Sequence, residues 1–232
     1  MQATGIIAEY NTFHNGHLYH IQETKRLTQQ PVIVVMSGSF MQRGEPAILS
    51  KWQRASCAVQ GGADLVLELP CVFTLRSAEF FAKGAVQLLA ATGCVNTLAC
   101  GTEHPQSDFE AAASLACSAE VQAKLRELLQ NGLSYAQAWE KILGANTAFR
   151  TPNDILALEY TKVLLQTAAY IQPLYLQRTD DGYNSTSISN SIASASAIRR
   201  AMADGNESWQ QAVPDYTHTA LANGGYDAQL LW

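Results

Sequence analysis

Apolar positions follow two alternating patterns along the chain. Short continuous apolar runs, several of them rich in β-branched residues, are typical of strands buried on both faces. Longer segments repeat an apolar residue every three or four positions, as helices with one buried side do. The short runs predict strands at 5–10, 31–36, 64–69, 95–100 and 171–176. The longer repeats predict helices at 17–27, 50–60, 77–91, 153–167 and 195–203, with a wholly helical stretch from 107 to 143.

The alternation of strands and helices predicts an α/β fold, a doubly wound parallel sheet with helices on both faces. The helical stretch interrupts this alternation, and we interpret it as a helical insertion at about 107–150. Residues 179–196 are rich in Ser, Thr, Asn and Gly, which predicts a mobile loop. We expect one main domain over 1–204, followed by the start of a C-terminal region at 205–232.

Composition narrows the class of protein. The 232 residues are 47% hydrophobic and only 15% charged, whereas the usual charged share is about 25%. A low charged share fits a compact α/β enzyme or a piece of a larger protein. The net charge of −5 predicts no overall basic surface for nucleic acid, so any such surface is local. The sequence has no basic leader and no apolar run of about 18 residues, so we expect a cytoplasmic protein without membrane contact.

The cysteines indicate no metal site. They number five, which is odd, and they form no CxxC pair. This argues against a zinc site and against a disulfide framework. Several lie in apolar runs, as Cys71 does, and we expect buried free thiols in a reducing compartment.

The most informative segment is Asn11-Thr12-Phe13-His14-Asn15-Gly16-His17, between the first predicted strand and the first predicted helix. A doubly wound sheet binds phosphate at this place, because backbone N–H groups point outward from the helix N-terminus. Gly16 would let a phosphate approach the backbone closely. His14 and His17 could donate hydrogen bonds on either side of a triphosphate. The alternative is that both histidines only cap the helix or lie at the surface.

A second candidate segment follows the second predicted strand, on the same edge of the sheet. It contains Ser37, Gly38 and Arg43, which could bind an anion or a carboxylate. Arginine suits both, because its guanidinium offers two parallel N–H donors. An ordinary glycine-containing loop is the alternative.

Two later segments carry further candidates. Gly101 ends the fourth predicted strand, where a glycine lets a ribose or an adenine lie against the backbone, although a simple turn glycine remains possible. Ser194, Ser196 and Arg199 open the last predicted helix. Hydroxyls and a guanidinium at a helix N-terminus are good phosphate partners. The alternative is a capping serine with a solvated arginine. The serine-rich run before them suits a lid that orders when a nucleotide binds.

These segments carry a resemblance to a known family. His14-Asn15-Gly16-His17 resembles the HxGH motif of the nucleotidyltransferase superfamily. The longer string 5–17, GIIAEYNTFHNGH, resembles the opening of the bacterial tRNA(Met) cytidine acetate ligases, in which proline is common in place of Thr12. Residues 192–199 resemble the superfamily signature ISSTxIR, with Ala193 and Ser196 as departures. The resemblance extends from Thr4 to about Asp204 and includes blocks at 36–47, 51–55, 62–70 and 77–82.

The resemblance implies a Rossmann-like nucleotidyltransferase fold with an ATP site. It implies catalytic roles for His14, His17 and Arg43, and substrate contacts for Ser37, Gly38 and Arg43. Asn153 and Arg178 would contact ATP, whereas on sequence alone they would be a helix cap and a solvated strand end. The implied ATP-binding residues are Ile7, Ala8, Glu9, Tyr10, Asn11, His14, Gly16, His17, His20, Gly101, Asn153, Arg178, Ser194, Ser196 and Arg199.

The resemblance also implies an activity, that of an ATP-dependent ligase. ATP would activate acetate as acetyl-adenylate, and N4 of the wobble cytidine of elongator tRNA(Met) would take the acetyl group. Mg²⁺ would accompany ATP, and no protein partner is inferred. Family members are usually longer, so we expect a shortened C-terminal region that holds tRNA poorly. Two alternatives remain: an adenylyltransferase for a phosphorylated metabolite, and a truncated, non-catalytic module that binds ATP or RNA.

Overall fold

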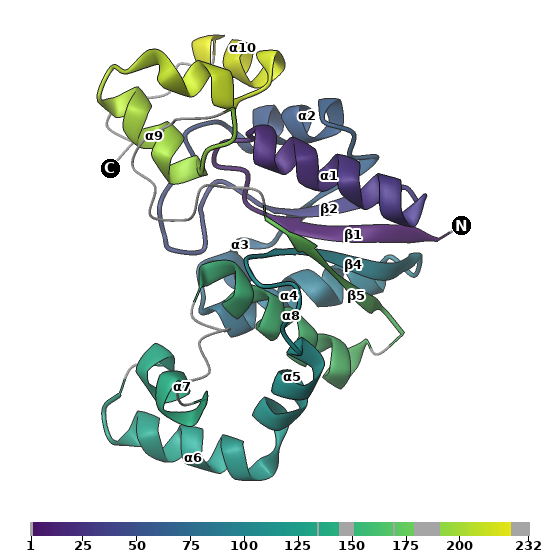
Figure 1. Cartoon of the computed structure of the whole chain (residues 1–232), viewed down its shortest axis with the longest axis vertical. Helices are drawn as coiled ribbons and strands as arrows, with labels where there is room; N and C mark the ends of the chain where they lie inside the picture. The colour runs from purple at the N-terminus through teal and green to yellow at the C-terminus, as the bar shows by residue number, and fades with distance from the viewer. Residues whose placement is uncertain (1, 134, 144–150, 169, 179–190, 224–232) are drawn as a thin grey trace.

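A single parallel sheet organises the molecule (Figure 1). The computed structural model describes residues 2–133, 135–143, 151–168, 170–178 and 191–223. Its strands are β1 (Ala3–Ala8), β2 (Val32–Ser37), β3 (Leu65–Leu69), β4 (Val95–Thr102) and β5 (Gln172–Gln177). They are all parallel and lie in the order β3-β2-β1-β4-β5. The prediction of a doubly wound α/β fold is confirmed.

Helices cover both faces of the sheet, as the continuous apolar strands require. In Figure 1, α1 (Asn15–Thr28) and α2 (Lys51–Gln60) lie above the sheet, and α4 (Ala78–Ala91) and α8 (Pro152–Thr167) lie below it. One apolar cluster joins α4 and α8 to the sheet. A second cluster joins α1 and α2 to the opposite face. All six residues of β2 are buried between these two layers.

The predicted helical stretch is present as three helices that extend away from the sheet (Figure 1). They are α5 (Phe109–Cys117), α6 (Ala119–Gln130) and α7 (Tyr135–Leu143). Ala116, Leu125, Ala138 and Trp139 form a small apolar cluster among them. Residues 144–150 of the expected insertion, and residues 179–190 of the expected mobile loop, lie outside the described residues.

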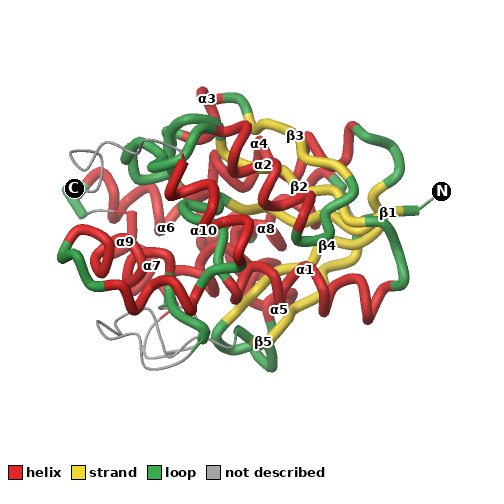
Figure 2. Tube along the Cα trace, turned by 90° about the horizontal axis from the view of Figure 1, so that it is seen from above, coloured by secondary structure: helices red, strands yellow, loops and turns green. Residues whose placement is uncertain are grey.

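A second group of helices lies on the side of α1 and α2. It consists of α9 (Ala195–Ala203), the 3₁₀ helix η2 (Glu207–Ala212) and α10 (Asp215–Asn223), and the strands run toward it (Figure 2). Its apolar residues pack on Ile48 and Leu49. The sequence pattern missed α10 because only Thr217 and Leu221 of this short helix are buried, which leaves no apolar stripe. The four-residue α3 (Cys71–Thr74) was also missed.

The cysteines only partly match their prediction. All five are free thiols, as expected. Cys57 and Cys100 are buried, whereas Cys71 is exposed and the other two are half-buried. The expectation of burial is wrong for Cys71, because it opens α3 at the surface. None of the described helices has the length and apolar content that a bilayer crossing requires.

Arg54 on α2 joins the ends of two strands to the segment that follows β2. Its side chain is 0% exposed. The guanidinium donates to the carbonyl oxygens of Glu9 at 2.5 Å, Ser37 at 3.0 Å and Leu49 at 3.3 Å, and also to that of Gly38. Burial lowers the pKa of Arg54 to about 10, so the group stays charged at neutral pH. This one side chain therefore shapes the edge of the sheet where β1 and β2 end.

We expect Arg54→Met to destabilise the protein by about 3 kcal/mol, because methionine fills most of the volume but leaves buried carbonyl groups without donors. Urea unfolding followed by circular dichroism measures the change. The control is Arg126→Met, which removes an exposed arginine from α6 and is expected to have little effect. Equal stability of the two variants would contradict the role given to Arg54.

Candidate active site

A cavity of about 440 Å³ opens at the carboxyl edge of the sheet. Its floor comes from the ends of β1, β4 and β5, and its walls come from α1, the segment Met41–Glu45, α4, α8 and the start of α9. The chain order reverses between β1 and β4, since β2 and β3 lie on one side of β1 and β4 and β5 on the other. Doubly wound sheets bind ligands at such a switch point.

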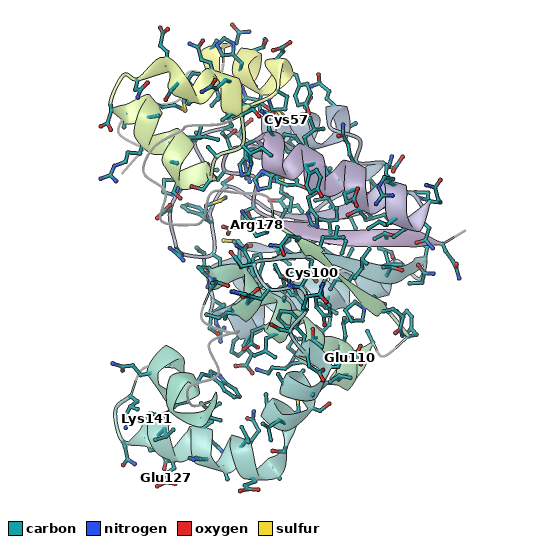
Figure 3. The ribbon with its side chains drawn as sticks, viewed as in Figure 1. Cys57, Cys100, Glu110, Glu127, Lys141 and Arg178 are labelled. Atoms are coloured by element: carbon teal, nitrogen blue, oxygen red, sulfur yellow. The ribbon has the colours of Figure 1, made fainter. Side chains whose placement is uncertain are left out.

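The cavity brings together most of the residues that the sequence singled out. Arg43 and all fifteen residues of the implied ATP set line it. Arg178, at the end of β5, and Cys100, on β4, lie near each other at this edge (Figure 3). Ser37 and Gly38 are not part of the lining, although the sequence offered them as substrate ligands. Ser37 is fully buried, and both carbonyl groups accept hydrogen bonds from Arg54.

The two motif histidines are held by hydrogen bonds at the start of α1. His14 is the N-cap residue, and its Nδ1 accepts a hydrogen bond from the N–H of Gly16 at 3.1 Å. Nδ1 of His17 accepts one from the N–H of His14 at 3.3 Å. The two rings stack with their centroids 3.7 Å apart. Because both Nδ1 atoms accept, each neutral ring carries its proton on Nε2.

Burial keeps the histidines of the cavity uncharged. Burial and, less strongly, the nearby Arg178 lower the pKa of His14 to about 3 and that of His20 to about 4. The pKa of His17 is also lowered, by burial and by the positive charge that its neighbours would add. The capping role that the sequence left as an alternative is present for both His14 and His17. Hydrogen bonds here come from neutral imidazoles.

Arginines from three different parts of the fold place positive charge in the cavity. Arg43 comes from the segment after β2, Arg178 from the end of β5, and Arg199 from α9. Arg199 donates to the carbonyl oxygen of Asn11 at 2.5 Å and lies 3.3 Å from a carboxylate oxygen of Glu45. These contacts join α9 to the loop after β1 and to the segment that carries Arg43.

The start of α9 presents two hydroxyl groups beside Arg199. Ser194 is the N-cap residue, and its Oγ accepts a hydrogen bond from the N–H of Ala197 at 3.2 Å. The hydroxyl oxygens of Ser194 and Ser196 lie 3.3 Å apart. Asn15 at the start of α1 donates to the carbonyl oxygens of Ser191 at 2.7 Å and Gln211 at 2.9 Å. The N-termini of α1 and α9 are thereby held at one cavity.

A polar network fixes the opposite end of the cavity. Nδ2 of Asn153 donates to Glu103 at 2.6 Å, and Oδ1 of Asn153 accepts from Arg178 at 3.4 Å. Asp154 is fully buried and accepts from the N–H groups of Glu103 and His104 at 3.0 and 3.3 Å. The N-cap residue of α8 is Thr151, so the capping alternative for Asn153 is wrong. Its amide links β4 to β5 instead.

Some site-forming residues were not proposed from the sequence. Arg54 and Asp154 are buried charged groups that hold cavity segments in place, and Glu45 contacts Arg199. Arg54 lies three and four residues before the buried Cys57 and Ala58, so it occupies the apolar side of α2. A charged residue in an otherwise apolar helix stripe was the available signal. Glu45 pairs with Arg199, which lies 154 positions away, and the sequence contained no signal for this pair.

Comparison with protein families agrees with this geometry. The model of the HIGH Nucleotidyl Transferase family matches residues 1–230. The chain belongs to this family. The histidine motif, the switch-point cavity and the parallel sheet are thus features of a HIGH nucleotidyl transferase.

Similar proteins narrow the comparison to one group of ligases. The chain is 46% identical to a tRNA(Met) cytidine acetate ligase of Leuconostoc mesenteroides, over 95% of this chain and 57% of that protein. It is 42% identical to the ligase of the same name from Acetivibrio thermocellus, over 89% of this chain and 52% of that protein. The chain therefore spans somewhat more than half the length of these relatives.

The chain is also similar to solved structures. The crystal structure of apo Thermotoga maritima TmcAL matches with a TM-score of 0.85 at 35% identity, over 96% of this chain and 56% of that one. TmcAL bound with alpha-thio ATP matches with a TM-score of 0.84 at 34% identity, over 96% of this chain and 55% of that one.

The lowered pKa of His14 predicts that acid destabilises the fold. The pKa is about 3 in the folded protein and about 6.5 in the unfolded chain, so the unfolded chain binds the proton first as the pH falls. His14 then costs about 2 kcal/mol of stability between pH 7 and pH 5. We expect His14→Asn, which keeps a capping oxygen, to remove this cost. Urea unfolding of both proteins across this range measures it, and parallel pH profiles would contradict it.

Proposed function

We propose that this chain binds ATP in the cavity, activates acetate as acetyl-adenylate, and acetylates N4 of the wobble cytidine of elongator tRNA(Met). The observation that carries the proposal is the convergence of N–H, hydroxyl and guanidinium donors from α1, α9 and β5 on one switch-point cavity. The likeness to a TmcAL bound with an ATP analogue supports it. The names of the relatives supply acetate and tRNA(Met) as the substrates to test.

The polar residues of the cavity suit the triphosphate. The Nε2–H groups of His14 and His17 and the hydroxyls of Ser194 and Ser196 would donate to phosphate oxygens, and Arg199 would balance their charge. Acetate would attack the α-phosphate in line, and pyrophosphate would leave. These donors are already in place, and they act where negative charge grows on the leaving group. No covalent bond to the protein is needed, because positioning and charge stabilisation supply the rate.

The other end of the cavity suits the nucleoside. A Cβ atom added to Gly101 would lie 3.5 Å from Cγ of Arg178 and 4.0 Å from Nε2 of His20. The glycine therefore keeps open the space between these side chains, where a ribose or an adenine would lie against β4. Asn153 and Arg178 already bond to each other there and would contact the nucleoside. Arg43 is left to bind the acid, without Ser37 and Gly38, which pack on Arg54.

Mg²⁺ belongs to the proposal as a companion of ATP. Within the described part of the chain, no group of three His, Cys, Asp or Glu side chains could hold a metal ion. Mg²⁺ prefers phosphate oxygens, water and one or two carboxylates, so ATP would supply most of its ligands. Glu45 is an exposed carboxylate that the described cavity lining could add.

The proposal includes a division of the chain. Residues 1–204 would form the catalytic unit, with the helices of about 107–150 as an insertion and residues 205–232 as the beginning of a further region. A tRNA-modifying enzyme of this kind would work in the cytoplasm. With a net charge of −5, the surface that holds tRNA has to be local.

The direct test measures two half-reactions. Acetate-dependent exchange of labelled pyrophosphate into ATP reports activation, and mass spectrometry of nucleosides from tRNA(Met) reports acetylcytidine. We expect acetate-dependent exchange, and acetylcytidine formation at a rate limited by weak binding of tRNA. A stable nucleotide-containing product from a phosphorylated metabolite would indicate the alternative adenylyltransferase. ATP binding without turnover would indicate a non-catalytic module.

Arg199 and its neighbour Arg200 give a matched test of the phosphate contacts. Arg199 lines the cavity, whereas Arg200 on the same helix is exposed and is not part of the lining. We expect Arg199→Gln to slow pyrophosphate exchange about 100-fold or more, since it removes a donor to the leaving group. Arg200→Gln should exchange at the wild-type rate. Equal losses in the two variants would show that helix α9 is only disturbed, and no loss in either would remove Arg199 from the mechanism.

A further inference from the structure

The two halves of the proposed reaction differ in their need for a base. Acetate attacks the α-phosphate as an anion, so activation releases no proton from the attacking group. Acetyl transfer forms an N–C bond from the amine N4 to the acetyl carbon, and one N–H proton has to leave. The exocyclic amine of cytosine is a weak nucleophile, so a group that takes this proton accelerates the step. The inference below rests on the proposed function.

The described walls of the cavity have contrasting chemistry. The α1 and α9 side is polar and carries the histidines, the two serines and Arg199. The opposite side comes from α4 and α8 and is mainly apolar. Apart from Asn153, its lining residues are apolar or aromatic: Ala78, Phe81, Pro152, Ile155, Leu156, Ala157 and Tyr160. A triphosphate suits the first wall, and a flat, uncharged aromatic ring suits the second.

Glu9 lies at the boundary between these walls. It directly follows β1, at the switch point, and it lines the cavity. Oε1 of Glu9 accepts a hydrogen bond from the N–H of Gln42 at 2.5 Å, while Oε2 has no donor among the described residues. Tyr160 of the α8 wall lines the same cavity as Glu9. One carboxylate oxygen is anchored and the other is available.

Other groups of the described lining are less suited to take the proton. His14 and His17 already accept hydrogen bonds at Nδ1 and carry their protons at Nε2, facing the phosphate side. Glu45 is the other carboxylate of this lining, but it is exposed and lies 3.3 Å from Arg199. Burial raises the pKa of Glu9, and the Gln42 N–H, Arg54, Arg199 and Arg43 oppose that rise. The carboxylate of Glu9 is therefore more basic than an exposed glutamate.

We infer that Glu9 is the catalytic base of acetyl transfer, taking the N4 proton of a cytosine ring that lies against the α4 and α8 wall. N4 forms a bond to the acetyl carbon, its proton passes to Oε2 of Glu9, and the bond from acetyl carbon to phosphate oxygen breaks. AMP leaves with that electron pair, and Glu9 then releases the proton to solvent. The step needs no oxidant, reductant or further reactant.

The test variant is Glu9→Gln, which keeps an oxygen to accept from Gln42 but cannot take a proton. Three rates are measured: acetate-dependent pyrophosphate exchange, acetohydroxamate formed when hydroxylamine replaces the acceptor, and acetylcytidine formed from tRNA(Met) or from millimolar cytidine. Because Glu9 lines the proposed ATP site, exchange and hydroxamate formation are the reference rates. We expect acetylcytidine formation to fall about 100-fold or more relative to both of these rates. The wild-type transfer rate should rise with pH to a plateau, and this dependence should disappear in the variant.

The matched control is Glu79→Gln, which removes an exposed carboxylate from the first turn of α4 outside the cavity lining. It should leave all three rates unchanged. Parallel loss of exchange and transfer in Glu9→Gln would overturn the inference by assigning Glu9 a structural role, and unchanged transfer would overturn it directly. Wild-type exchange without acetylcytidine from either acceptor would overturn it too, because no acceptor ring would bind. Failure of acetate-dependent exchange in the wild type refutes the proposed function itself.

Discussion

The buried guanidinium of Arg54 is the contact on which the cavity depends. It reaches carbonyl groups of Glu9, Ser37, Gly38 and Leu49, which belong to the end of β1, the end of β2 and the segment before α2. A buried charge is stable only when hydrogen bonds replace its lost water, and four backbone carbonyls do so here. The segment that carries Arg43 is thereby held beside the strand that carries Glu9.

In the cavity, the histidines are uncharged and the arginines carry the positive charge. The histidines are neutral, since burial and the nearby Arg178 lower their pKa values, and backbone N–H groups fix which ring nitrogen donates. Charge comes from arginines on separate elements. Neutral rings avoid repulsion among close imidazolium groups. In the proposed reaction, the arginines would supply the charge compensation that a triphosphate requires.

One cavity could serve two consecutive steps because its walls differ. All four helices reach the cavity with their N-terminal parts. The walls differ because α1 and α9 bring polar side chains there, whereas α4 and α8 bring mainly apolar ones. Glu9 lies between them because β1 is the strand at which the chain order reverses.

The sequence by itself determined the class of fold and the place of the site. Buried β-branched runs alternating with helices allow few arrangements other than a parallel sheet, and the histidine motif after the first strand marks the edge at which the cavity opens. The sequence did not predict helix α10, because its two buried residues are too few to form an apolar pattern. Tertiary structure alone decided that Ser37 and Gly38 face Arg54 rather than the cavity, and that Glu45 meets Arg199. These contacts join positions far apart in the chain, so local sequence patterns do not predict them.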